Sequence, residues 1–117
     1  MHQFKELLIW KKSRLFCSHI YSITSTFPND EKFGLTNQLR RATISIPSNI
    51  AEGSSRNSNK DFSRFLEIAI GSAYEIETQL LISFDLGFLK SDQLEILIVQ
   101  LEEIIKMISK FRSTLKV

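Results

Sequence analysis

Residues 45–80 read "SIPSNIAEGSSRNSNKDFSRFLEIAIGSAYEIETQL", and they place a proline, a glycine and a polar turn between two helical patterns. Pro47 has no N–H, so the carbonyl of Thr43 loses its usual helical partner and a kink is expected there. Gly53 suits the left-handed residue that closes a helix. Ser58 is followed three residues later by an acidic residue, a variant of the capping box that begins a helix. The stretch therefore predicts a kinked helix, a short turn and a second helix.

The same periodicity extends outward from this stretch. Apolar residues recur at three- and four-residue spacing and predict four amphipathic helices at about residues 4–26, 35–53, 60–86 and 91–115. Turn residues separate the first two helices, and Gly87 ends the third. No segment alternates as a strand does. We therefore predict one domain over residues 1–117, an all-α antiparallel up-and-down four-helix bundle.

Composition limits the compartment and the class of protein. The single cysteine, Cys17, cannot form an internal disulfide, which favours a reducing compartment. No apolar run approaches the ~20 residues of a membrane span, and the first residues lack the cleavage site of a signal peptide. We expect a cytoplasmic protein with no membrane partner.

Charge is distributed unevenly along the chain. The formal net charge is only +2, but residues 1–59 hold eight Lys or Arg against four Asp or Glu, and residues 60–117 hold seven against nine. A basic first half suits a polyanion, and it equally suits subunits that pack basic half against acidic half.

Four segments together resemble a known family. They are "FP" at 27–28, "GLTNQLRRATISIPSNIAEGSSRNS" at 34–58, "FLEIAIGSAYEIETQL" at 65–80 and "DLGFL" at 85–89. The chain resembles, over nearly its whole length, the bacterial proteins encoded by intervening sequences inserted in 23S ribosomal RNA genes. One departure is Ile70, where the family often has a basic residue.

The resemblance implies a four-helix bundle and kinship to the accessory variability determinants of diversity-generating retroelements. Those proteins are basic, ring-shaped homopentamers that associate with a reverse transcriptase and with nucleic acid. By this resemblance we expect a homo-oligomer, a pentamer, with RNA, DNA or a nucleoprotein enzyme as partner. The resemblance implies no established biochemical activity.

Six basic residues are the candidate nucleic-acid contacts, because Arg and Lys bind phosphate oxygens. They are Lys11, Lys12, Arg14, Arg40, Arg41 and Arg56. Two alternatives stand beside this interpretation. Lys11, Lys12 and Arg14 also suit an ordinary solvated helix face. At least one of Arg40 and Arg41 suits a salt bridge to a neighbouring helix or subunit. The candidate partners of that salt bridge are Glu52, Glu67 and Glu75.

Catalytic and cofactor signals are weak. The di-iron pattern of helical bundles needs a histidine three residues after a glutamate, and neither His2 nor His19 satisfies it. Cys17 has no basic partner at a readable spacing and is better explained as a small core residue. A Gly-rich phosphate loop is lacking. We therefore expect no metal, no cofactor and no enzymatic activity, and an RNA-processing nuclease is the least supported reading.

Two further features favour packing roles. Gly71 lies inside a predicted helix, where glycine costs ~1 kcal/mol relative to alanine, so we expect a close helix or subunit approach there. Several apolar residues lie off the core stripes and are candidates for a subunit interface: Leu8, Trp10, Leu15, Tyr21 and Leu81. These observations favour a nucleic-acid-associated oligomeric adaptor, with a protein-interaction scaffold that binds no nucleic acid as the alternative.

Overall fold

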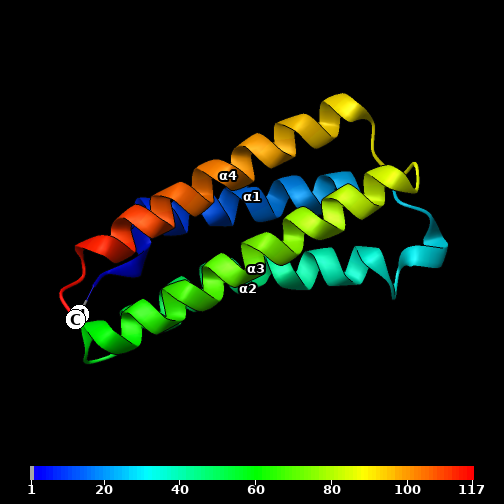
Figure 1. Ribbon diagram of the computed structural model, residues 1–117. Coiled ribbons are helices and arrows are strands. Elements are labelled where there is room, and N and C mark those ends of the chain that lie inside the picture. Colours follow the sequence, from blue (N-terminus) through cyan, green and yellow to red (C-terminus); the bar gives the residue numbers. More distant parts are fainter. Residues whose placement is uncertain (1) are drawn as a thin grey trace.

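Four α-helices make up most of the chain in a computed structural model that describes residues 2–117 (Figure 1). They are α1 (Leu8–Thr24), α2 (Leu35–Ser54), α3 (Asn59–Asp85) and α4 (Ser91–Thr114). Each helix packs against its neighbours in sequence, and α4 closes the ring against α1. Residues 2–117 contain no strand. The prediction of an all-α antiparallel four-helix bundle is confirmed. Among the described residues, none of the helices is long and apolar enough to cross a membrane.

The first helix is shorter than the sequence predicted. A 3-10 turn, η1 (Phe4–Glu6), precedes it, and Leu7 between them has an extended backbone with φ −75° and ψ 128°. A second 3-10 turn, η2 (Asn29–Glu31), lies in the connection to α2. The break at Leu7 lets that side chain pack against the core although it lies off the apolar stripe of α1. Periodicity alone could not locate the break, since a continuous helix satisfies the same pattern.

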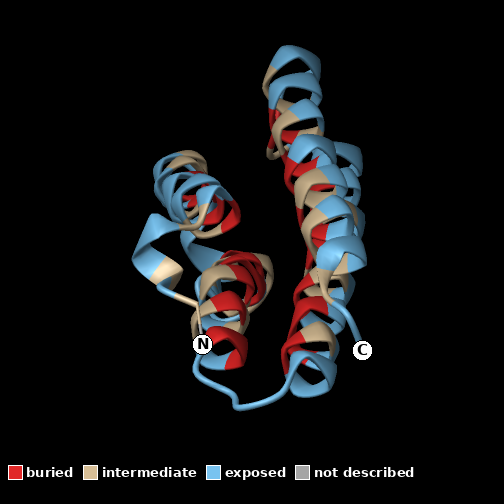
Figure 2. Ribbon diagram, turned by 90° about the vertical axis from the view of Figure 1, so that its left-hand side faces the viewer, coloured by how far each residue is buried: buried red, intermediate tan, exposed pale blue. Residues whose placement is uncertain are grey.

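The core lies between the helices. Figure 2 shows that the buried residues occupy the faces that the helices turn toward one another. Every helix contributes to a single apolar cluster, whose fully buried members include Ile20, Leu39, Ile46, Ile50, Leu66, Ile76, Leu80 and Ile108. These residues lie on the stripes predicted from spacing, but the stripe predicted for α3 also included Phe84, which is exposed.

Pro47 does not interrupt α2, which is helical from Leu35 to Ser54. The carbonyl of Thr43, which the proline leaves without a helical N–H, instead accepts a hydrogen bond from the Cys17 thiol of α1 at 3.5 Å. A group from the neighbouring helix thus satisfies the backbone oxygen that the sequence identified as unpaired.

Gly53 does not close α2 in a left-handed conformation, and that prediction is wrong. Its backbone is helical, and among residues 2–117 only Gly87 has a positive φ, at 82°. A Cβ atom on Gly53 would lie 2.7 Å from Phe65 Cβ and 2.8 Å from Phe62 Cδ1. The glycine is required by the close approach of α3. Serine hydroxyls at 54 and 55 bond the last carbonyls of the helix instead.

Gly71 shows the reverse. It is exposed on α3, and a Cβ atom there would meet nothing within 4 Å. The close helix approach predicted at Gly71 is therefore absent within this chain. Two other predictions about α3 hold. The hydroxyl of Ser58 accepts the Asp61 N–H at 3.1 Å at its start, and Gly87 adopts its positive φ just beyond the end.

The two glycines should respond oppositely to alanine. We expect Gly53→Ala to lower the free energy of unfolding by about 1–3 kcal/mol, because the new methyl overlaps two phenylalanines. Gly71→Ala should raise it by up to ~1 kcal/mol, because alanine is the better helix former and has open space. Urea denaturation of both variants checks this. Destabilisation by both substitutions would contradict the open space at Gly71.

Candidate nucleic-acid interface

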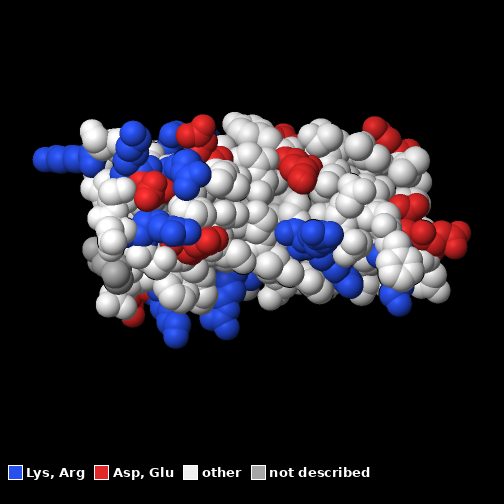
Figure 3. All heavy atoms as spheres, turned by 90° about the horizontal axis from the view of Figure 1, so that it is seen from below, with Lys and Arg blue, Asp and Glu red and all other residues white. Residues whose placement is uncertain are grey.

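Charge is polarised along the long axis of the bundle more strongly than along the sequence. We divide the molecule at the helix midpoints into a basic half, which holds both described ends of the chain and the α2–α3 turn, and an acidic half at the other end. The basic half comprises residues 2–16, 45–72 and 103–117, and the acidic half residues 17–44 and 73–102. The basic half carries eleven Lys or Arg and five Asp or Glu. The acidic half carries four Lys or Arg and eight Asp or Glu. Figure 3 shows Lys and Arg crowding the left side of one face and Asp and Glu at its far right edge.

Two predicted contact residues, Lys11 and Arg14, line one open hollow in the basic half together with Lys5 and Trp10. The Arg14 guanidinium lies 5.3 Å from the centre of the Trp10 ring, and the Phe4 ring packs on Trp10 at 5.2 Å. Trp10 is half-buried and Lys5, Lys11 and Arg14 are exposed. Cations around an accessible aromatic ring are the elements of a single-stranded nucleic-acid site. Lys5 was missed from the sequence because its position on the separate turn η1 was not foreseen.

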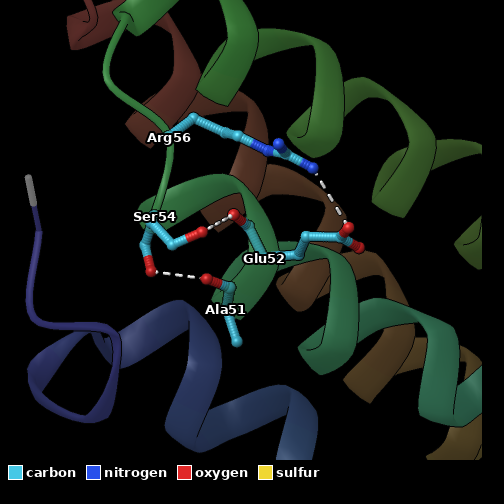
Figure 4. A network of polar contacts seen from close by, with 5 residues as sticks. Ala51, Glu52, Ser54 and Arg56 are labelled. Carbon is cyan, nitrogen blue, oxygen red and sulfur yellow. Dashed lines mark hydrogen bonds and ion pairs between the residues drawn. The ribbon is translucent and has the colours of Figure 1, made fainter.

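Lys12 lies on the opposite flank of α1, facing α4. Its ammonium pairs with Glu103 at 3.2 Å. Arg56, at the α2–α3 turn, reaches back to Glu52 at 3.2 Å, as Figure 4 shows, and its guanidinium lies 4.8 Å from the Phe65 ring. Both pairs are exposed, and such pairs contribute only ~0–1 kcal/mol, so a phosphate could replace either carboxylate.

Arg40 is held within the fold. Its Nε donates to Thr24 Oγ1 at 2.9 Å, Nη2 donates to the Tyr21 carbonyl at 3.3 Å, and the guanidinium lies 4.4 Å from the Tyr21 ring. These acceptors lie in the last turn of α1, where unpaired carbonyls attract a cation. The residue therefore has a structural role, although through hydrogen bonds and not through the salt bridge that the sequence suggested.

Arg41 points away from Arg40, toward the seam of α2 and α3, where it lines a polar hollow with Glu75 and Gln79. Among residues 2–117, the ion pairs within 4.0 Å are Lys12–Glu103, Arg56–Glu52 and Arg112–Glu67, and neither Arg40 nor Arg41 takes part in one. The six predicted residues thus lie on several flanks of the bundle, and only Lys11 and Arg14 meet in one hollow.

Two further observations concern metal-ligating side chains and the single thiol. Residues 2–117 hold no cluster of three metal-ligating side chains. Cys17 is half-buried, and burial raises the pKa of its thiol from 9.0 to about 11, with the backbone hydrogen bond acting weakly in the opposite direction. A thiol of that pKa is a poor nucleophile at neutral pH.

The sequence matches the family model described as 23S rRNA-intervening sequence protein over residues 5–110. The chain belongs to this family. A crystal structure of a protein of unknown function from the S23 ribosomal protein family of Bacteroides thetaiotaomicron VPI-5482 is similar to it, with 26% sequence identity and a TM-score of 0.81. The similarity covers 92% of this chain and 100% of that one. No curated protein matches the sequence.

The adjacent arginines should differ in their effect on stability. Arg40→Met should lower the free energy of unfolding by about 1–2 kcal/mol, because it leaves Thr24 and the Tyr21 carbonyl without their donor. Arg41→Met, with the same change one residue on, should stay within ~0.5 kcal/mol of the parent protein. Chemical denaturation of the two variants measures the difference, and equal effects would contradict the structural role of Arg40.

The Cys17 thiol should react slowly while the chain is folded. At pH 8 we expect alkylation by iodoacetamide to be roughly 100-fold slower in the folded chain than in denaturant, since the thiolate fraction falls tenfold per unit of pKa. A raised folded pKa also stabilises the fold below about pH 9, and this contribution is lost as the pH rises through about 11. The chain has one cysteine, so the rate reports on Cys17 alone. Equal rates in both states would contradict the burial.

Proposed function

We propose that this protein is a non-enzymatic homo-oligomeric adaptor that binds RNA or DNA through the basic half of its bundle. The observation that carries the proposal is the hollow where Lys5, Lys11 and Arg14 surround Trp10. Proteins bind nucleic acid chiefly by neutralising its phosphates with Lys and Arg side chains. The excess of cations in the basic half supplies that attraction, and the exposed part of the Trp10 and Arg14 pair is the surface on which an unpaired base would stack.

The proposed binding is weakly specific. No groove-reading element accompanies the hollow, and stacking on an aromatic ring tolerates every base. Single-stranded loops and ends are therefore the favoured targets, since their bases are free to leave the helix stack. A nucleoprotein enzyme that carries a single-stranded segment would be bound through the same hollow. The proposal places the protein in the bacterial cytoplasm, where these partners are found.

Self-association is the second part of the proposal. Leu8, Leu15, Tyr21 and Leu81, candidates for a subunit interface, are all exposed, whereas Trp10 packs against the core. These four exposed apolar side chains are the candidate contacts with another chain. The pentamer itself is implied by the family resemblance alone.

A protein-interaction scaffold is the competing function, favoured by one feature. Leu8 and Leu15 of α1 and Ile96 and Val99 of α4 are each more than half exposed, and apolar hollows follow the α1–α4 seam. A surface of that chemistry suits a protein partner and offers nothing to a phosphate.

We expect binding of a short single-stranded RNA to quench the fluorescence of Trp10, which is the only tryptophan in the chain. The double variant Lys11→Glu/Arg14→Glu should bind at least ~10-fold more weakly and should lose about 1.4 from the slope of log affinity against log salt, two contacts at ~0.7 each. The matched control, Lys32→Glu/Lys90→Glu, makes the same charge change in the acidic half.

Fluorescence titration and light scattering after size exclusion, both at low and moderate salt, separate the outcomes. An oligomer that binds RNA, and loses it in the double variant but not in the control, supports the adaptor. An oligomer that does not bind RNA contradicts the adaptor and supports the protein-interaction scaffold. A monomer that ignores RNA contradicts both. Equal loss in the two double variants would place the binding outside the Trp10 hollow.

A further inference from the structure

A second hollow lies between α2 and α3, separate from the Trp10 hollow and in the acidic half. Asn37, Gln38, Arg41, Ala42, Glu75 and Gln79 line about 290 Å³ of space there. Apart from the Ala42 methyl, every lining side chain is polar or charged. The seam is firmly built, because α2 and α3 are the most closely packed helix pair.

One buried atom of a residue that lines this hollow has no hydrogen-bond partner. Gln79 is 8% exposed, and its Oε1 is the single buried side-chain N or O atom without a partner among the described residues. Its Nε2 makes a long bond of 3.4 Å to Gln38 Oε1. A buried amide oxygen left unpaired destabilises the protein, so a donor that reaches Gln79 gains an interaction that no side chain supplies.

The charged groups beside this oxygen are of opposite sign and unpaired. Arg41 comes from α2 and Glu75 from α3, and both are exposed. Neither forms an ion pair within residues 2–117. A guanidinium binds a carboxylate through two parallel hydrogen bonds. A carboxylate and an amide oxygen together accept the hydrogens of an ammonium group, which has three to donate.

We propose that the α2–α3 hollow binds a small zwitterion of the α-amino-acid class. Arg41 receives the ligand carboxylate, and Glu75 and Gln79 Oε1 receive its ammonium group. The amides of Asn37 and Gln38 contact the remainder of the ligand. The volume is at the lower end of the range for small-molecule sites, which suits a ligand of this size.

The lining residues also weigh against a nucleobase. A flipped or unpaired base is normally held by stacking on an aromatic ring or on a guanidinium plane. The one guanidinium that lines this hollow belongs to Arg41, which the proposal assigns to the ligand carboxylate, and no aromatic residue lines it, whereas the Trp10 hollow offers an aromatic ring. The zwitterion site is therefore independent of the proposed nucleic-acid function, and either can fail while the other stands.

The test is a titration of the full-length isotope-labelled protein with a panel of free L-α-amino acids, followed by backbone amide chemical shifts. We expect at least one amino acid to shift the signals of residues around Arg41 and Gln79. Its decarboxylated amine and its N-acetyl derivative should each bind at least about tenfold more weakly, because each retains only one of the two charges.

Two substitutions and two matched controls assign the effect. Arg41→Met and Glu75→Gln should each weaken binding at least about tenfold. Arg64→Met on α3 and Glu95→Gln on α4 make the same changes at exposed sites outside the hollow and should leave binding unchanged. Gln79→Met should abolish binding while leaving the chain at least as stable, since it removes the unpaired oxygen.

Three outcomes would overturn the proposal. The first is no shift around the hollow with any amino acid at about 10 mM, a concentration at which even millimolar affinity saturates the site. The second is binding that survives both Arg41→Met and Glu75→Gln. The third is a response to guanosine monophosphate alone, which would make the hollow a base-reading site.

Discussion

The approach of α3 to Gly53 of α2 leaves no room for a side chain at that position. A single Cβ at that position would overlap both Phe62 and Phe65, so the absence of a side chain sets the distance between the two helices. Farther along the seam the hydroxyls of Ser45 and Ser72 meet at 2.8 Å, and Asn49 donates to the Ser45 carbonyl and hydroxyl. Short polar side chains can bond across the seam only because the backbones are near one another. The tight α2–α3 pair is the rigid element against which the other helices pack.

The α1–α4 seam is built differently. Few residues of the two helices meet, and the polar contacts across it include Lys12–Glu103 at 3.2 Å and His19–Gln100 at 3.1 Å. Hollows follow its length, with exposed leucine, isoleucine and valine beside them. A bundle with one tight and one loose seam offers two kinds of surface. The tight seam positions fixed polar groups, and the loose seam leaves apolar surface exposed.

Periodicity was sufficient to predict the four helices, because each buries one stripe and needs nothing from its neighbours to reveal it. It could not assign Gly53, since a glycine that ends a helix and a glycine that admits a neighbour look alike in one sequence. The distribution of charge was likewise only partly visible. An antiparallel fold brings Lys5 and Lys11 to the same end as Lys110 and Arg112, so a count over halves of the chain mixes the two ends of the molecule. Gln79 was missed because its isolation becomes visible only when the surrounding helices are in place.

Arg40 and Arg41 illustrate why a pair of basic residues is not a unit on a helix. Consecutive residues lie about 100° apart around the axis, so Arg40 reaches the end of α1 while Arg41 reaches α3. The Trp10 hollow of one chain has only three exposed cations, which are Lys5, Lys11 and Arg14. Three phosphate contacts give weak binding at physiological salt. Several copies on one strand raise the effective concentration of each site and multiply the affinity without any new contact. The oligomeric and the nucleic-acid parts of the proposed function are therefore physically linked, because self-association would strengthen the weak binding expected of one chain.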